Sequence, residues 1–344
     1  MRRARRLGAV LCCLLLLLTL LSACGQEPRR IMTYYEYFDT VTNVIGYDSE
    51  KDFNAACDIV EGILQEYHRL SDIYYEYAEG NNACTLNRAA GQTPVELDAR
   101  LLDVLDYGKE MYALTNGYCN IAMGAVLSLW HTCRDAALAG EAVSLPDPEV
   151  LRAAAEHTSI DDLVIDRAAG TAFLRDPAMS LDLGAVAKGY ATECAAQALI
   201  EAGYTGYVLS VGGNDRAVGG KPDGNPWVIG IQDPTLVSED AYRLKVDVSD
   251  GSLVTSGSYQ RYFSLNGVRY HHIISPDTLM PENDFLSVTV STESSALADA
   301  LSTAIFNMPL EDGLNYVNQM DGVEVCWILA DASIVFSDGF EGYE

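Results

Sequence analysis

Two side chains near the C-terminal end of the chain carry the kind of ligands that a hard divalent cation prefers. Asp299 and Thr303 lie in the segment Ser294–Met308, whose length and good helix formers predict a helix. Residues four apart share one helix face, so the carboxylate and the hydroxyl would point the same way. Oxygen ligands of this kind suit Mg²⁺, which also holds phosphates. Such a pair is more often part of a solvated helix face, so its meaning depends on other residues.

Two glycine-containing segments upstream could hold phosphate. In Leu181–Tyr190 (LDLGAVAKGY), a strand-like start leads through a turn into a helix. Backbone N–H groups at such a turn favour phosphate, and Lys188, one of few lysines in the chain, adds a mobile charge. The spacing is not that of a Walker A loop. In Ser210–Asn214 (SVGGN), paired glycines after a strand suit a ligand that approaches closely. A plain turn is the alternative interpretation of each segment.

The adjacent histidines His271 and His272 lie in a strand-like run. Neighbouring strand residues point to opposite faces, so at most one of the two enters a given site. A strand histidine is most often a satisfied core or edge residue.

The first residues predict export and lipidation. Four arginines precede an apolar run from Leu7 to Leu21, which is too short for a convincing membrane span and is typical of a secretory signal. The sequence Leu-Ser-Ala-Cys then ends at Cys24 and resembles a bacterial lipobox. We therefore expect a signal peptide over 1–23, a lipid-anchored linker over 24–34, and a protein on the extracytoplasmic face of the cell membrane. The alternative is an uncleaved anchor.

The composition fits an exported body of about 320 residues, enough for a sizeable core. The net charge of −27 disfavours nucleic acid and anionic lipid as electrostatic partners. Six cysteines follow Cys24 at wide spacings without a CxxC pair. Their pattern favours scattered core thiols over a zinc cluster or a disulfide framework.

The coarse pattern of elements predicts an α+β fold with a mainly antiparallel sheet and packed helices. Apolar periodicity predicts helices over 52–70, 101–116 and 148–157, and small residues predict another over 185–202. Strand-like runs occupy 207–211, 227–231, 244–248 and 286–290, and hairpins are expected around 163–174 and around Asn266-Gly267. The segment 128–148 is expected to be a surface insertion. Many strands adjoin one another, which favours antiparallel pairing.

Several short motifs in a fixed order carry a family resemblance. Phe38-Asp39-Thr40, Asn87, Thr115–Tyr118 and Leu129-Trp130 are followed by LDLGAVAKGYA, SVGGN, TSGSYQRYF, HHIISP and ADALSTA. Over about 35–338 this order resembles the ApbE family of FAD:protein FMN transferases. The resemblance implies one ApbE-like (T-fold-like) domain over 35–344.

The resemblance also implies an activity and a site. Such enzymes use Mg²⁺ to move the FMN moiety of FAD onto a Thr or Ser of a target protein, and AMP leaves. The implied target is a flavoprotein subunit of a membrane electron-transfer complex. By position, the resemblance assigns catalysis to His272, Lys188 and Asp299; the metal to Asp299, Thr303 and the Ala185 carbonyl; and FAD to Phe38, Tyr118, Cys119, Asn120, Asp182 and Lys188.

The chain departs from the common family pattern at four places. Phe38-Asp39-Thr40 stands where many members have Met-Gly-Thr, and Cys119-Asn120 replaces Phe-Asp. Ser275 and Leu279 replace an Asp and a Gly. Two other functions stay open: a Mg²⁺-dependent FAD pyrophosphatase that gives FMN and AMP, and a non-enzymatic lipoprotein that binds flavin or another solute.

Overall fold

A computed structural model describes residues 27–235 and 242–343 of the chain. The predicted signal peptide and Cys24 lie outside the described residues. Within those residues, no helix is both long and apolar enough to cross a membrane.

The largest element is an eight-stranded antiparallel sheet in the order β1-β2-β6-β7-β10-β13-β14-β15. Its strands are Arg30–Tyr34 (β1), Thr42–Gly46 (β2), Tyr207–Val211 (β6), Asn214–Val218 (β7), Gly251–Gly257 (β10), Phe285–Thr292 (β13), Glu324–Leu329 (β14) and Ile334–Phe336 (β15). The predicted α+β fold with a mainly antiparallel sheet is confirmed. The edge strand β1 begins inside the segment that the sequence suggested as a linker.

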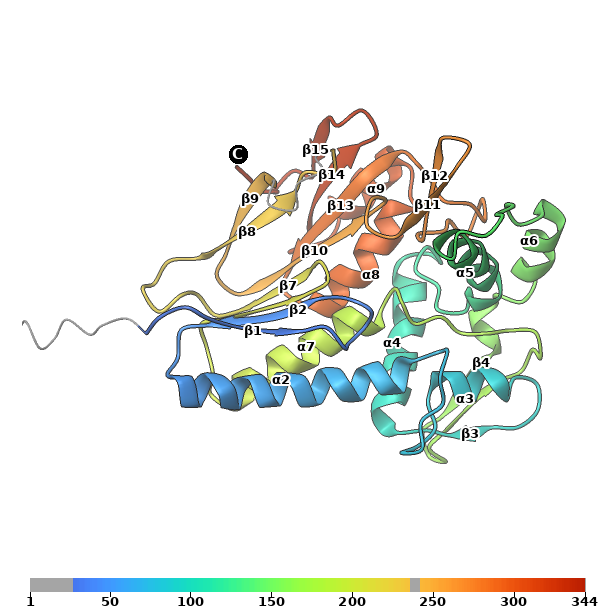
Figure 1. Ribbon diagram of the computed structural model, residues 1–344, viewed down its shortest axis with the longest axis horizontal. Helices are drawn as coiled ribbons and strands as arrows, with labels where there is room; N and C mark the ends of the chain where they lie inside the picture. Colours follow the sequence, from blue (N-terminus) through green and yellow to red (C-terminus); the bar gives the residue numbers. More distant parts are fainter. Residues whose placement is uncertain (1–26, 236–241, 344) are drawn as a thin grey trace, which may run out of the picture.

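Helices cover one face of this sheet (Figure 1). They are α2 (Glu50–Ser71), α7 (Ala187–Glu201) and α8 (Ser295–Phe306), with α9 (Leu310–Val317) nearby. The helix α2 begins where Ser49 accepts a hydrogen bond from the Asp52 backbone, and its apolar stripe is buried. The helix α7 buries mostly Ala and Gly, so its backbone can lie close to its neighbours.

A two-stranded ribbon covers part of the other face. It consists of β8 (Trp227–Gln232) and β9 (Tyr242–Val248), as the sequence predicted. Its inward side chains, such as Trp227 and Val246, pack with sheet residues such as Leu253 and Ile328 in a second apolar cluster. Helices therefore cover one face of the large sheet, and this ribbon covers part of the other.

The remaining elements form a lobe beside the sheet (Figure 1). It contains α3 (Ala83–Arg88), α4 (Ala99–Leu114), α5 (Gly124–Leu138), α6 (Pro148–Ala155), a 3₁₀ turn (Ile160–Asp162), and the small sheet of β3 (Val95–Glu96), β5 (Thr171–Leu174) and β4 (Leu163–Asp166). The hairpin of β11 (Tyr262–Leu265) and β12 (Val268–His271) packs against α5 and turns at Asn266-Gly267 as predicted.

The predicted surface insertion over 128–148 is wrong for its first half. Residues up to Leu138 belong to α5, where Trp130 is 3% exposed and donates a hydrogen bond from its indole N–H to the Leu279 carbonyl. The alanine-rich composition concealed a helix that packs against the β11–β12 hairpin. Only the stretch after α5 is irregular.

Candidate active site

A cavity of about 1050 Å³ opens between the large sheet and the lobe. Its walls are the loop 38–41, the segment 71–77 after α2, the turn 182–188, the ends of β6 and β10, and α8. Ligand pockets commonly measure about 300–1,000 Å³, so this cavity has room for a large ligand such as a dinucleotide. Nearly all the site residues expected from the sequence line it. They are Phe38, Tyr118, Asn120, Asp182, Ala185, Lys188, His272, Asp299 and Thr303.

The buried carboxylate of Asp299 is the most constrained charge in the cavity. The residue is 5% exposed. Its Oδ1 accepts a hydrogen bond from Lys188 Nζ at 2.9 Å, and its Oδ2 accepts one from the Gly189 backbone N–H at 2.7 Å. The ammonium also donates to Asn214 Oδ1. A buried charge needs such partners, so the three residues hold one another in place.

Close packing of α7 against α8 sets this geometry. A Cβ at Gly189 would lie 2.3 Å from the Asp299 Cβ and 2.5 Å from the Ser295 carbonyl oxygen. On the next turns, Glu193 accepts from the Ser295 N–H at 2.7 Å and from Arg216 Nε at 3.2 Å. Through Glu193, hydrogen bonds therefore connect α7 to both α8 and β7, close to the Asp299 carboxylate.

Residues with further oxygen ligands line the same cavity as Asp299. Thr303 lies one turn further along α8 and lines the same cavity, as does Ala185 in the turn before α7. No group of three or more His, Cys, Asp or Glu side chains in the described part of the chain could hold a metal. A cation at Asp299 would therefore depend on hydroxyl, carbonyl, phosphate and water oxygens, which are ligands that Mg²⁺ accepts.

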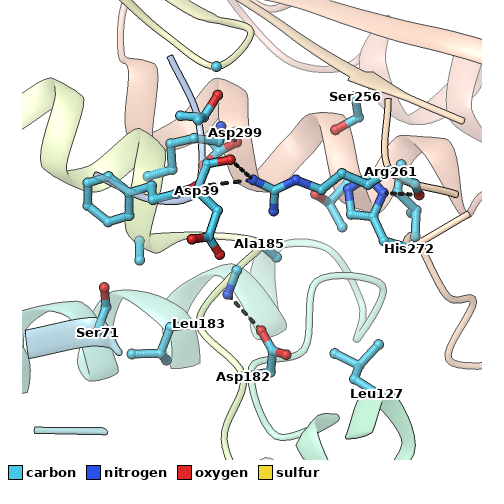
Figure 2. A pocket seen from close by; sticks show the side chains of 18 of the residues that line it. Asp39, Ser71, Leu127, Asp182, Leu183, Ala185, Ser256, Arg261, His272 and Asp299 are labelled. Atoms are coloured by element: carbon cyan, nitrogen blue, oxygen red, sulfur yellow. Dashed lines mark hydrogen bonds and ion pairs between the residues drawn. The ribbon is translucent and has the colours of Figure 1, made fainter. Parts of the chain in front are cut away.

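Asp182 lies across the cavity from Ser256 and Arg261 in the close-up (Figure 2). Its Oδ1 accepts the Gly184 N–H at 2.9 Å, which shapes the turn before Lys188. His131, on α5, brings its Nε2 to 3.7 Å from Asp182 Oδ2 and its Nδ1 to 3.1 Å from the Tyr74 hydroxyl. Burial lowers the pKa of His131 in spite of the nearby carboxylate. The imidazole therefore favours the neutral form.

The two adjacent histidines point apart, as predicted. His271 is buried and its Nε2 lies 2.6 Å from the Glu282 carbonyl oxygen, a structural contact. His272 lines the cavity, with Nδ1 3.3 Å from the Arg261 carbonyl oxygen. Because a carbonyl only accepts, Nδ1 carries the proton and Nε2 is left as an acceptor. Loss of solvation, and then the charge of Arg261, lower the pKa of His272 to about 3.

Arg261 links the segment after β10 to the loop 38–41 at the cavity mouth. Its guanidinium donates to the carbonyl oxygens of Phe38 at 3.1 Å and Asp39 at 2.9 Å (Figure 2). The backbone of these two residues is left-handed, with φ values of +54° and +51°, a conformation that residues other than glycine rarely adopt. The Phe38 N–H also donates to His68 Nδ1 at 3.2 Å. The strained loop is therefore held from both sides.

Tyr118, Cys119 and Asn120 have different surroundings. The hydroxyl of Tyr118 donates to Asp277 at 3.0 Å, and burial and this contact raise its pKa. Asn120 lines the cavity, but its amide is engaged by the Thr158 carbonyl and the Ala122 N–H. Cys119 is fully buried and its side chain does not line the cavity. This thiol can contribute to a ligand site only through its neighbours.

The sequence motifs alone do not predict the contacts of Arg261, His131 and Asn214. Arg261 and Asn214 lie inside recognised motifs, TSGSYQRYF and SVGGN, so their positions were visible while their contacts were not. His131 follows Leu129-Trp130 directly and is one of five histidines, which is the signal that could have identified it. The six free cysteines of the described residues are buried, apart from the partly buried Cys194, as the interpretation as core thiols expected.

The sheet, its helical cover and the charged cavity define an α+β protein with an enzyme-like site. The comparisons are more specific. The model of the ApbE family matches residues 38–327, most of the chain, and the chain therefore belongs to the ApbE family.

Named relatives span almost the whole chain. The FAD:protein FMN transferase of Treponema pallidum is 31% identical over 97% of this chain and 93% of its own length. That of Escherichia coli is 27% identical over 89% and 88% of the two chains. The solved flavin transferase ApbE of Vibrio cholerae superposes with a TM-score of 0.75 at 26% identity, covering 91% and 98% of the chains. The predictions of an ApbE-like chain and of a transferase are confirmed.

Proposed function

We propose that this protein transfers the FMN moiety of FAD to a Thr or Ser hydroxyl of a target flavoprotein, with Mg²⁺ and with release of AMP. One observation carries the proposal: the buried Asp299 carboxylate and Lys188 face a cavity of dinucleotide size. Relatives that bear the name FAD:protein FMN transferase support the choice of substrate.

The metal would be held by the Asp299 carboxylate, the Thr303 hydroxyl and the Ala185 carbonyl. Mg²⁺ bound there would neutralise charge that builds on the oxygens of a breaking diphosphate. Lys188 adds a positive charge on the same side of the cavity, where exclusion of water strengthens each electrostatic contact. These residues act on the phosphates rather than on the flavin.

The rest of FAD would lie along the remaining walls. The Asp182 carboxylate offers acceptors to hydroxyl or amino groups, and the Phe38 ring and the Tyr118 ring line the cavity. Asn120 would contribute mainly by fixing the segment that contains Tyr118 and Cys119, because its amide is already hydrogen-bonded. Binding of this kind orients the reacting phosphate toward the acceptor.

His272 would take the proton of the acceptor hydroxyl at Nε2. The hydroxyl oxygen forms a bond to the FMN phosphorus, the bond from that phosphorus to the bridging oxygen breaks, and AMP leaves with the bridging oxygen and its electron pair. The proton then passes from His272 to solvent. Since a pKa of about 3 makes a weak base, the negative diphosphate has a second effect: once bound, it raises the pKa of His272 toward the useful range.

We also propose that the mature protein begins at a lipidated Cys24 and works on the extracytoplasmic face of the cell membrane. The basic, apolar and Leu-Ser-Ala-Cys segments of 1–24 support this location. Its partner would be a flavoprotein subunit of a membrane electron-transfer complex. A lipid anchor would hold enzyme and target at the same surface, which raises their effective concentration.

Mass spectrometry of both products tests this function. The chain is incubated with FAD, Mg²⁺ and a protein acceptor from a membrane electron-transfer complex, and the acceptor and AMP are measured together. Gain of FMN by the acceptor, with an equal amount of AMP, is expected, and both are lost with EDTA. AMP and free FMN without modified acceptor would instead identify the hydrolase, and unchanged FAD would identify a binding protein.

A further inference from the structure

The Lys188 ammonium lies on the carboxylate that the proposed metal would need. Its Nζ is 2.9 Å from Asp299 Oδ1, and the side chains of Lys188 and Asp299 are only 20% and 7% exposed. A lysine ammonium is a compact positive charge, so it competes with another cation for the same oxygen. A cation that arrives at Asp299 must therefore displace this charge or tolerate its repulsion.

Asn214 gives the ammonium a second partner beside Asp299. Its Oδ1 accepts from Lys188 Nζ, and because an ammonium only donates, this contact fixes which way the amide faces. Asn214 is fully buried, and its Nδ2 has no hydrogen-bond partner among the residues that the structure describes. The side-chain hydrogen bond of Asn214 in the described residues is therefore the one that its oxygen accepts from Lys188. When Nζ leaves Asp299, it keeps this partner and stays in the cavity.

We propose that Lys188 is a resident counter-ion that occupies the metal position of Asp299 in the free protein, and that Asn214 is the positioning residue that holds the ammonium when it moves off. The inference rests on the proposed function, in which Asp299 binds the metal. The oxygens of a bound diphosphate attract the ammonium away from the carboxylate. Lys188 would therefore change partners, from Asp299 to Asn214 and phosphate.

This exchange makes metal and FAD binding depend on each other. Without FAD, the metal binds weakly because it displaces the ammonium. With FAD, the diphosphate stabilises the displaced lysine, so each ligand strengthens the other by the same factor. Direct coordination of the metal by the diphosphate would also couple the two ligands, so only the part of the coupling that depends on Lys188 tests the proposal.

Two substitutions in the full-length protein have opposite expected effects on metal binding without FAD. Lys188→Met removes the competing charge and is expected to tighten Mn²⁺ binding by about tenfold, within the usual range of coupling. Asn214→Leu keeps a similar volume but removes the second partner, so the ammonium stays on Asp299 and Mn²⁺ binding weakens by about threefold. Titration of Mn²⁺ by electron paramagnetic resonance, without FAD and with it, measures both dissociation constants.

Lys109→Met is the matched control. Lys109 donates to the Leu163 carbonyl at 2.8 Å, away from the cavity lining, and its loss is expected to leave Mn²⁺ affinity unchanged. In Lys188→Met, the factor by which FAD tightens Mn²⁺ binding is expected to fall. Asp299→Asn is expected to abolish the binding in every background.

The outcomes separate this inference from the proposed function. If Lys188→Met and Asn214→Leu both weaken Mn²⁺ binding, both residues only support the carboxylate and the exchange is wrong, while the metal site stands. If Asp299→Asn binds Mn²⁺ as the native protein does, the metal lies elsewhere and both proposals fail. Should Lys188→Met not fold, a tighter metal in Asn214→Leu would still overturn the exchange.

Discussion

The two sides of the cavity are built in different ways. On one side, which we call the helix wall, Lys188 and Asp299 come from α7 and α8 and lie on buried backbone that leaves no room for a Cβ at Gly189. On the other side, the loop wall, His272 follows a hairpin and Arg261 holds the left-handed residues Phe38 and Asp39. Packing fixes the first wall, whereas a few hydrogen bonds fix the second.

Under the proposed function, this difference would give the two walls separate tasks. Charges that act on phosphates need positions fixed to within fractions of an ångström, and buried helices supply that rigidity. Under the proposed function, an acceptor protein would enter and leave past the other wall, where loops can adjust. We therefore expect changes in the helix wall to cost both stability and catalysis, and changes in the loop wall to alter catalysis with smaller effects on stability.

The largest effect is expected for Asp299→Ala in the helix wall. A metal contributes several kcal/mol of charge stabilisation, so loss of its carboxylate should reduce kcat/KM by about 10³-fold. Transfer of FMN to the acceptor, followed by mass spectrometry, measures the rate. Asp321→Ala, an exposed carboxylate elsewhere, should leave the rate unchanged. An Asp299→Ala variant within tenfold of the native rate would show that the helix wall does not perform the chemistry.

His272→Ala in the loop wall should reduce kcat/KM by about 10²-fold, the lower end for general base catalysis, because a base of low pKa contributes less. Its thermal stability should change little. The kcat/KM for FAD reports the free protein, so it should show no loss from His272 between pH 8 and pH 5, since a group with a pKa of about 3 stays neutral there. A fall centred near pH 6.5 that disappears in His272→Ala would contradict this.

Arg261→Gln tests whether the charge of Arg261 helps to lower the pKa of His272. The positive charge of Arg261 is the second cause, after loss of solvation, of the low pKa of His272. Without it the pKa rises, so the imidazole becomes protonated, and is lost as a base, at a higher pH than in the native protein. The acid limb of the profile of kcat/KM against pH should therefore move to higher pH. An unmoved limb would remove Arg261 as a cause.

Gly189→Ala tests the packing of the helix wall. The added Cβ would meet Asp299 Cβ and the Ser295 carbonyl, so overpacking should cost about 1–3 kcal/mol of unfolding free energy. The matched control is Gly62→Ala in α2, where nothing lies within 4 Å of the new Cβ. There, removing a helical glycine should stabilise the protein by about 0.5–1 kcal/mol. Urea unfolding of both variants gives the two changes in unfolding free energy. If both changes have the same sign, Gly189 is not held in the tighter packing that we infer for the helix wall.

The helix wall was largely predictable from the sequence. Asp299 and Thr303 are four apart on one helix, and Lys188 follows a glycine-containing turn, so short-range patterns placed each residue on its element, while the resemblance brought them into one site. The opposite orientations of His271 and His272 also followed from strand alternation. Short-range rules worked where the elements are regular.

The loop wall was not predictable in the same way. The hydrogen bonds from Arg261 to Phe38 and Asp39 span more than 220 positions in the sequence, and no periodicity encodes them. The alanines after His131 suggest an insertion, whereas the buried Trp130 shows that this part of α5 packs into the protein. Long-range contacts of this kind depend on tertiary packing, which a single sequence does not reveal.

The smallest effect, and the most direct comparison of the walls, comes from placing glycine in each. Asp39 has a φ of +51°, so Asp39→Gly removes a left-handed penalty of about 1–2 kcal/mol while the freer unfolded chain costs about 0.5–1 kcal/mol. The net expectation is about 0.5 kcal/mol of added stability, with the backbone carbonyl still available to Arg261. In the helix wall, Ala191→Gly in buried α7 should lose at least about 1 kcal/mol. Urea unfolding measures both. A destabilised Asp39→Gly would mean that the Asp39 side chain makes a contact that stabilises the loop, and that backbone strain is not what distinguishes the loop wall.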